Sequence, residues 1–208
     1  SYLIKTPEDI PRIIREAFYL AASGRPGPVL IDFPKDVSSA LIDPDYTDDF
    51  HLPGYEVPAE IEENDLIEVA ALLKKAEKPI LLVGHGAVIS GAESSVKYLA
   101  EKMQIPVVHT LLGKGCFPKT HDLSLGMLGM HGTAYANKSV NECDLIMSIG
   151  SRWDDRITGK TEVFCKDAVK IHIDIDPAEI DKVLKVDKSI VGDALVVLKA
   201  LSPFLEPG

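Results

Sequence analysis

From residue 61 onward, segments with helical spacing of apolar residues alternate with short, uninterrupted apolar runs. Apolar positions that recur every three or four residues predict helices. These helices are expected at 64–76, 92–103, 133–141 and from 194 onward. The apolar runs predict strands at 79–83, 106–109, 144–149, 169–174 and 189–191. Such runs are typical of strands covered on both faces, and their alternation with helices predicts an α/β fold with a doubly wound, mainly parallel six-stranded sheet.

The first 60 residues lack this regularity. Apolar positions between Ile10 and Ala21 predict one helix, and residues 29–32 predict a short strand that ends before Pro34. Residues 38–60 show no periodicity and are rich in proline and aspartate, which is typical of a linker. We therefore expect residues 1–37 to be the end of a preceding domain, 38–60 a linker and 61–208 a separate domain.

Composition excludes several classes of protein. With 46% hydrophobic and 26% charged residues, the chain of 208 residues is expected to fold around a core. A formal net charge of −10 argues against partners such as nucleic acid or an anionic membrane. The start of the chain has neither a signal-peptide layout nor a Met, so we expect a processed or excised chain. The odd number of cysteines, without metal-ligand spacing, predicts free thiols in a reducing compartment.

The residues that follow the predicted strands indicate a binding site, because open parallel sheets bind ligands beyond the carboxyl ends of their strands. These strand ends carry the segments 84–87, 110–113, 150–152, 174–176 and 192–193. Their glycines let the backbone approach a phosphate closely. Arg152 and Arg156 could bind a pyrophosphate, and Asp174 or Asp193 could accept hydrogen bonds from ribose hydroxyls. Together these ends predict a ligand such as an adenine dinucleotide.

Each local motif is incomplete by itself. Residues 84–86 read Gly-His-Gly, but Ile89 replaces the third glycine of a dinucleotide fingerprint. Gly86 and Gly91 have P-loop spacing, yet Ala92 stands where that loop needs Lys. Any one of these glycines could equally mark a tight strand-to-helix turn. The nucleotide interpretation therefore depends on the five strand ends taken together.

Histidines and cysteines form no recognisable catalytic or metal pattern. His51, His109 and His121 stand apart from other potential ligands, so no metal site is expected. His172 lies inside an apolar strand and is expected to be a core residue with satisfied hydrogen bonds. Cys116 has no identifiable base beside it, which argues against a nucleophile.

Two further features have two interpretations each. Residues 154–156 read Asp-Asp-Arg, which suits either a surface ion-pair cluster or an anion site. Met127 and Met130 lie in a glycine-rich loop expected at 111–132, where they could pack internally or lie against a flat ring.

Four longer segments resemble a known family. These are 24–37, 123–137 with its Gly-Met-Leu-Gly-Met-His-Gly core, 150–156 and 172–177. They resemble thiamine-diphosphate enzymes, and within them the large catalytic subunit of acetolactate synthase. The resemblance covers essentially the whole chain. It implies three α/β domains, of which this chain would contain the last helix and strand of the pyrimidine-binding domain and then the Rossmann-like central domain.

The resemblance also implies cofactors and partners. The central domain would hold FAD in a largely structural role, in a homodimer or homotetramer that can carry a small regulatory subunit. The residues expected at FAD are Arg25, Gly84, His85, Gly86, Thr110, Leu111, Leu112, Met127, Gly129, Met130, His131, Gly132, Gly150, Ser151, Arg152, Asp154, Arg156, Asp174, Ile175, Asp193 and Ala194. Lys35, Met130 and Asp155 resemble residues near the substrate channel. His85 departs from the family, since many relatives carry a glycine there.

The implied reaction joins two pyruvates, or pyruvate and 2-oxobutyrate, with loss of CO₂ in branched-chain amino acid biosynthesis. The family motif for thiamine diphosphate and Mg²⁺ begins Gly-Asp-Gly, and residues 192–194 read Gly-Asp-Ala instead. We therefore expect both sites outside this chain, no catalytic residue within it and no synthase activity of the chain alone. The expected compartment is the cytoplasm, or a plastid or mitochondrion in a eukaryote.

Other functions stay open on the sequence alone. The chain could be the central domain of glyoxylate carboligase, oxalyl-CoA decarboxylase or pyruvate oxidase. It could also be a free-standing NAD-binding module, in which residues before 36 would be an integral part of one domain. A nucleotide sensor without catalytic activity is a third alternative.

Overall fold

The computed structural model describes residues 1–43, 52–57 and 60–207. They belong to two compact units, Ser1–Val57 and Pro58–Gly208. The linker expected at 38–60 overlaps the gaps between the described ranges, and His51 lies outside them. Each unit is described here by itself.

The first unit is built around a helix and two short strands. Its elements are β1 (Tyr2–Leu3), η1 (Pro7–Asp9), α1 (Ile10–Ala22), β2 (Ile31–Asp32) and α2 (Lys35–Ser38). β1 and β2 pair in parallel, in a sheet separate from the main one. The strand expected at 29–32 is shorter than predicted, because β1 offers it only two residues to pair with. Ile4, Ile13 and Val37 form the small core of this unit.

The second unit contains the predicted sheet. Its strands are β3 (Pro79–Val83), β4 (Val107–His109), β5 (Ser124–Met127), β6 (Leu145–Ile149), β7 (Val169–Asp174) and β8 (Lys188–Val191). Their order is β5-β4-β3-β6-β7-β8, and every neighbouring pair is parallel. The prediction of a six-stranded parallel sheet is therefore confirmed.

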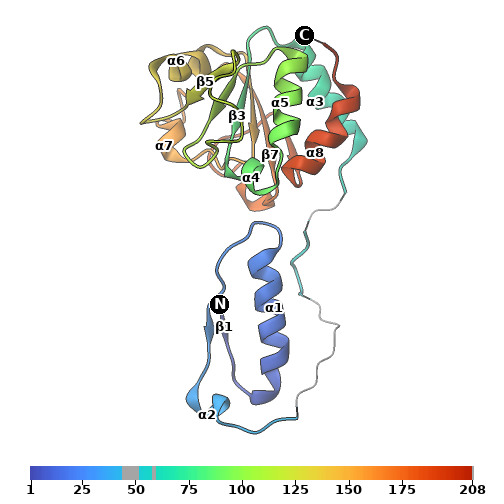
Figure 1. The fold of residues 1–208 in the computed structure, drawn as a ribbon, viewed down its shortest axis with the longest axis vertical. Coiled ribbons are helices and arrows are strands. Elements are labelled where there is room, and N and C mark those ends of the chain that lie inside the picture. Colours follow the sequence, from blue (N-terminus) through green and yellow to red (C-terminus); the bar gives the residue numbers. More distant parts are fainter. Residues whose placement is uncertain (44–51, 58–59, 208) are drawn as a thin grey trace. The chain divides into compact units, whose positions relative to one another are not determined.

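Helices cover both faces of this sheet (Figure 1). They are α3 (Glu63–Lys75), α4 (His85–Ile89), α5 (Glu93–Met103), α6 (Ala134–Glu142), α7 (Asp155–Thr158), η2 (Pro177–Glu179), α8 (Ala194–Leu201) and η3 (Ser202–Phe204). One hydrophobic core joins α3, α5 and α8 to the sheet, and a second joins α6 and residues 153–168 to its other face. The doubly wound arrangement expected from the sequence is thus present.

Alternate residues of each central strand pack into the two hydrophobic cores on opposite faces of the sheet. Leu81 and Val83 of β3 belong to the core beneath α3, α5 and α8, whereas Ile80 and Leu82 belong to the opposite core. Because successive side chains in a strand point to opposite faces, a strand covered on both faces must be apolar throughout. This is the physical reason for the uninterrupted apolar runs in the sequence.

Several short elements were not predicted, among them β1, α2 and η3. The loop expected at 111–132 contains β5, which is only half-buried and is interrupted by Gly126 at a φ of +80°. An edge strand of this kind lacks the apolar run that marks a central strand. The short helices α4 and α7 were also missed, because five and four residues are too few for a helical pattern.

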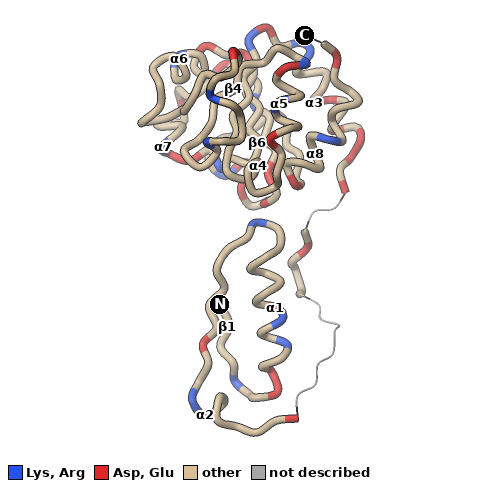
Figure 2. Tube along the Cα trace, viewed as in Figure 1, with Lys and Arg blue, Asp and Glu red and all other residues tan. Residues whose placement is uncertain are grey.

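Basic and acidic residues are interspersed along the trace of the second unit (Figure 2). No helix within the described ranges is long and apolar enough to cross a membrane.

Asp144, directly before β6, holds the loop before β3 in place by hydrogen bonds. Its carboxylate accepts hydrogen bonds from the backbone N–H groups of Glu77 at 2.7 Å and Lys78 at 2.9 Å. Asp144→Ala leaves both donors without this acceptor, so we expect it to lower the free energy of unfolding of the second unit by about 1–2 kcal/mol. Urea denaturation measures the change. The matched control is Asp167→Ala, whose exposed carboxylate makes only a 3.9 Å ion pair with Lys166 and should change stability by less than about 0.5 kcal/mol. Equal losses in the two variants would contradict this role.

Candidate functional site

The candidate site lies where the order of the sheet reverses. β3 and β6 are neighbours at the centre of the sheet; the chain proceeds from β3 to β4 and β5 on one side and from β6 to β7 and β8 on the other. The loops after β3 and β6 therefore lead away from each other. Ligands of open α/β sheets bind outside the carboxyl ends of the strands at such a point.

Glycines at this point bring two backbones into direct contact. The N–H of Gly84 donates to Ile149 O at 2.9 Å, and the N–H of Gly86 donates to Gly150 O at 3.0 Å. A Cβ at Gly84 would lie 2.1 Å from that Gly150 oxygen, and one at Gly86 would lie 2.8 Å from Gly150 Cα. Gly150 itself has a φ of +62°. Residues with side chains could not form this close approach, so the glycines predicted at these two strand ends lie together.

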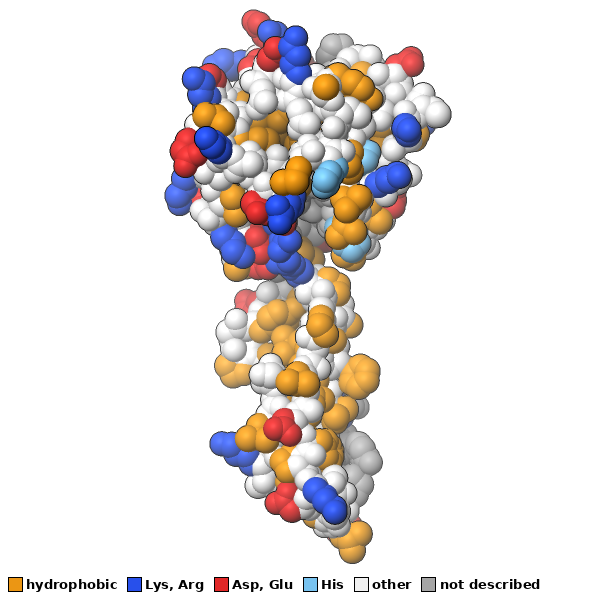
Figure 3. Space-filling model, turned by 90° about the vertical axis from the view of Figure 1, so that its left-hand side faces the viewer, with side chains coloured by type: hydrophobic (Ala, Val, Ile, Leu, Met, Phe, Trp, Pro, Cys, Tyr) orange, Lys and Arg blue, Asp and Glu red, His pale blue; other side chains and the backbone are white. Residues whose placement is uncertain are grey.

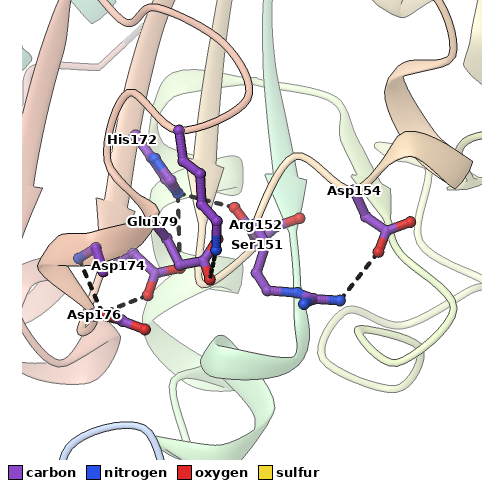
Figure 4. Close-up of polar contacts among 9 residues, drawn as sticks. Ser151, Arg152, Asp154, His172, Asp174, Asp176 and Glu179 are labelled. Atoms are coloured by element: carbon purple, nitrogen blue, oxygen red, sulfur yellow. Dashed lines mark hydrogen bonds and ion pairs between the residues drawn. The ribbon is translucent and has the colours of Figure 1, made fainter.

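The next residue along the chain, Ser151, is held by its carbonyl group (Figure 4). His172 Nε2 lies 2.9 Å from Ser151 O, and the hydroxyl of Ser148 donates to the same oxygen at 3.2 Å. His172 and Ser148 occupy paired positions on β7 and β6 and are completely buried. The backbone that leads to Arg152 is thus fixed from beneath by two side chains of the sheet.

His172 is the core residue expected from the sequence, but its hydrogen bonding is incomplete. Its Nδ1 atom has no hydrogen-bond partner among the described residues, and the same holds for Nε1 of Trp153. The two rings are in edge contact, with centroids 5.6 Å apart, and Trp153 has a φ of +56°. A positive φ is strained for a residue with a bulky side chain, so the backbone at Trp153 is strained beside the candidate site.

Arg152, Asp154 and Arg156 form a small charged cluster after β6. Asp154 accepts a hydrogen bond from the backbone N–H of Arg156 at 2.9 Å and pairs with the Arg152 guanidinium at 3.0 Å (Figure 4). The hydrogen bond from the Arg156 N–H is the main cause that lowers the pKa of the Asp154 carboxyl below its usual value. The hydrogen bond with Asp155 and the charges of both arginines lower this pKa further. Both arginine side chains are exposed. The cluster therefore contains the surface ion pair of the first interpretation, whereas the anion site stays a prediction.

The two aspartates expected near a ribose are engaged with backbone N–H groups. Asp174 is 7% exposed and accepts from the N–H of Asp176 at 3.0 Å (Figure 4). Asp193 caps α8 by accepting from the N–H groups of Leu195 and Val196. Each carboxylate keeps lone pairs for a further donor. The same two strand ends also carry Ile175, directly after Asp174, and Ala194, directly after Asp193.

The loop after β5 is tied to the charged cluster. The N–H of Met130 donates to Arg156 O at 2.8 Å, and the Asn137 amide bonds both the N–H and the carbonyl of Gly129 at 3.0 Å. Asn137 and Ser148 were given no supporting role by the sequence analysis, because such roles depend on contacts between distant segments. The residues from Met127 to Gly132 therefore lie beside the loop that follows β6.

Several side chains at this edge are exposed and apolar. Thr110 is buried and its N–H donates to Val83 O, whereas the following Leu111 and Leu112 are 69% and 63% exposed. Met130 is 65% exposed, so Met127 and Met130 are not both packed internally. His85 and His131 are exposed as well. One face of the second unit shows hydrophobic and histidine side chains gathered together (Figure 3).

Two predicted residues belong to the other unit. Arg25 and Lys35 are exposed residues of the first unit. Asp155 begins α7 and is exposed. Within the second unit, then, all of the predicted strand ends border one edge of the sheet.

The residues present fit a nucleotide such as FAD better than a metal ion. Gly84, Gly86 and Gly150 pack backbone against backbone at this edge, and exposed guanidinium groups and apolar side chains border them. These are the groups that suit a pyrophosphate and a flat ring system. Over the described ranges, no three His, Cys, Asp or Glu side chains are grouped so that they could hold a metal ion.

Comparison with known proteins supports the same fold. Residues 66–201 match the family described as "Thiamine pyrophosphate enzyme, central domain". The chain is 48% identical to "Probable acetolactate synthase large subunit" of Methanocaldococcus jannaschii, over 97% of this chain and 34% of the relative. It is 49% identical to "Acetolactate synthase" of Arthrospira platensis, over 95% of this chain and 35% of the relative. It is 46% identical to "Acetolactate synthase, chloroplastic" of Arabidopsis thaliana, over 99% of this chain and 31% of the relative.

The chain spans about a third of the length of the curated relatives that it matches. The family match covers most of the second unit, and the resemblance to acetolactate synthase large subunits extends over both units. The chain therefore belongs to the thiamine pyrophosphate enzyme family, and its residues 66–201 are the central domain of that family.

Proposed function

We propose that this chain is the FAD-binding central part of an acetolactate synthase large subunit. The observation that carries the proposal is the backbone contact of Gly84 and Gly86 with Gly150 at the switch point of the sheet. That contact leaves an edge bordered by the exposed guanidinium groups of Arg152 and Arg156. The relatives named acetolactate synthase support the choice of enzyme.

Each strand end has a role in this proposal. Arg152 and Arg156 bind the pyrophosphate by charge-assisted hydrogen bonds, while the glycines admit it close to the backbone. The loop from Met127 to Gly132 lies along the flavin. The residues at 174–175 and 193–194 border the adenosine end. FAD in this position orders the loops of the edge and takes no part in the condensation.

The proposed reaction belongs to the whole enzyme. It joins two pyruvates, or pyruvate and 2-oxobutyrate, and releases CO₂. Thiamine diphosphate, when bound with Mg²⁺ by other parts of the enzyme, activates the first 2-oxo acid for decarboxylation and carbon–carbon bond formation. Lys35, Met130 and Asp155 would lie near the channel that the 2-oxo acids follow. We propose a homodimer or homotetramer, with or without a small regulatory subunit.

The cellular compartment of the enzyme depends on the organism that it comes from. One relative is named as chloroplastic, and the others that we compared carry no compartment in their names. We favour the cytoplasm, with a plastid or mitochondrion as the eukaryotic equivalent.

A free-standing NAD-binding module is the main competing function. Such a module would include residues 1–35 in one domain, whereas these residues belong to a compact unit of their own. Central domains of other thiamine-diphosphate enzymes compete as well, since the fold alone does not fix the substrate.

Nucleotide selectivity tests the proposal. We expect FAD to raise the melting temperature of the chain and to lose flavin fluorescence on binding, because its ring and pyrophosphate meet the apolar and cationic groups of the edge. Titration of FAD, NAD and ADP under the same conditions measures the order of affinity. Tighter binding of NAD than of FAD would overturn the assignment in favour of the competing module.

Removing one guanidinium tests the pyrophosphate contact. Arg152→Ala eliminates a charge-assisted hydrogen bond, so we expect FAD to bind at least about tenfold more weakly. Isothermal titration with FAD measures this. Lys138→Ala is the matched control, because Lys138 is an exposed cation of the same unit with a 3.8 Å ion pair to Glu142. Its affinity should be unchanged; equal weakening in both variants would indicate a general effect of charge.

Activity of the chain alone is a separate test. Residues 1–208 contain no Gly-Asp-Gly motif for thiamine diphosphate. We therefore expect no acetolactate when the purified chain is incubated with pyruvate, thiamine diphosphate, Mg²⁺ and FAD. A colorimetric assay for acetoin after acidification detects the product, and product above the protein-free background would show that the thiamine site has been wrongly located.

A further inference from the structure

Two buried cysteines lie together beneath the face of the sheet that carries α6. Cys143 follows α6 directly, and Cys165 lies in the segment between α7 and β7. They are 7% and 2% exposed and belong to the same hydrophobic core. Sequence analysis treated them as unrelated thiols, because residues so far apart along the chain share no local pattern.

Shared hydrogen bonds bring the two thiols side by side. Both Sγ atoms lie against the carbonyl oxygen of Val140, Cys143 at 3.0 Å and Cys165 at 3.1 Å. Each thiol has a single proton, so Cys165 can donate to the Cys143 sulfur only when it does not donate to Val140 O. Cys116, the third cysteine, belongs to the core on the opposite face of the sheet and cannot reach them.

We propose that Cys143 and Cys165 are a site of reversible oxidation that forms an intrachain disulfide with hydrogen peroxide as the oxidant. The Cys143 thiolate attacks one oxygen of the peroxide, the O–O bond breaks, and the leaving hydroxide takes up a proton to become water. The product is a sulfenic acid on Cys143. The Cys165 sulfur then attacks the Cys143 sulfur, forming the S–S bond and releasing a second water as the Cys165 proton is transferred. Peroxide is reduced to two waters, and the two thiols are oxidised.

The order of the two steps follows from the environment of each thiol. The hydrogen bond from Cys165 lowers the pKa of the Cys143 thiol, against the opposing effect of burial and of Asp144. The same hydrogen bond raises the pKa of Cys165. The thiolate is the reactive form, so Cys143 reacts first and Cys165 resolves it. By contrast, burial raises the pKa of the Cys116 thiol to about 11, which leaves it unreactive.

Each cysteine has an exposed residue next to it in the sequence, although the cysteine side chains themselves are buried. Glu142 precedes Cys143 and Lys166 follows Cys165, and both of these neighbours are exposed. A small local opening therefore suffices to admit a molecule as small as peroxide. The apolar core that closes again over the sulfenic acid keeps out a second peroxide, so attack by the adjacent Cys165 is favoured over further oxidation.

Peptide mapping tests the site. The folded chain is treated with hydrogen peroxide, the remaining thiols are alkylated and the protein is digested with trypsin, which cuts the three cysteines into separate peptides. We expect the number of alkylated cysteines to fall from three to one, with a peptide pair that joins Cys143 to Cys165 and has lost two hydrogens. Reduction with dithiothreitol should restore all three.

Variants separate the roles of the cysteines. Cys116→Ser should leave the bridge unchanged and is the matched control. Cys165→Ser should abolish the bridge and leave Cys143 as its sulfenic acid, because no thiol is left to resolve it and the closed core excludes a second peroxide. Far-UV circular dichroism and the melting temperature establish that each variant is folded. Alkylation of all three cysteines after peroxide treatment of the folded wild-type chain, or a bridge to Cys116, would overturn the proposal.

Discussion

The direct contact between the ends of β3 and β6 is the constraint on which the candidate site depends. A side chain at Gly84 would collide with the Gly150 carbonyl oxygen, and Gly150 adopts a backbone angle that residues with a Cβ rarely take. The contact joins the starts of two loops, which then lead to opposite sides of the sheet. The order of the parallel strands determines that these loops lie at the carboxyl ends of the strands. A ligand of the site would therefore lie against glycine backbone that exposed side chains border.

The two faces of the sheet contribute differently to the molecule. The core beneath α3, α5 and α8 is apolar and supplies stability through burial. The opposite face carries the polar groups that shape the site, since Ser148 and His172 reach the Ser151 carbonyl from that side. The incomplete hydrogen bonding of His172 and Trp153 belongs to this face too. Strain at this position is tolerated because the apolar face and the parallel pairing hold the strands in place.

Sequence reasoning succeeded where burial dictates the residue type. The runs at 79–83 and 144–149 could be predicted because strands covered on both faces admit few polar residues. β5 could not be predicted, because a half-buried edge strand that contains Gly126 has no such run. The position of the segments at one edge of the sheet could be predicted because parallel strands share their carboxyl ends, whereas their role in binding stays a prediction. The backbone hydrogen bonds of Asp174 and Asp193, and the contact between Cys143 and Cys165, depend on how distant segments pack.

The polar face also links the cysteine pair to the candidate site through short, rigid elements. Cys143 caps the end of α6, and Asn137 within the same helix holds Gly129 of the loop proposed to lie along FAD. The segment that contains Cys165 follows α7, which begins directly after Asp154. Met130 donates to Arg156 O, so the two routes meet again at the edge of the sheet. A covalent bond between residues 143 and 165 would close a ring that contains β6, the loop after it and α7, and so both arginines. The loop from Met127 to Gly132 lies outside this ring, but the hydrogen bond from Met130 to Arg156 O would pass the restraint on to it.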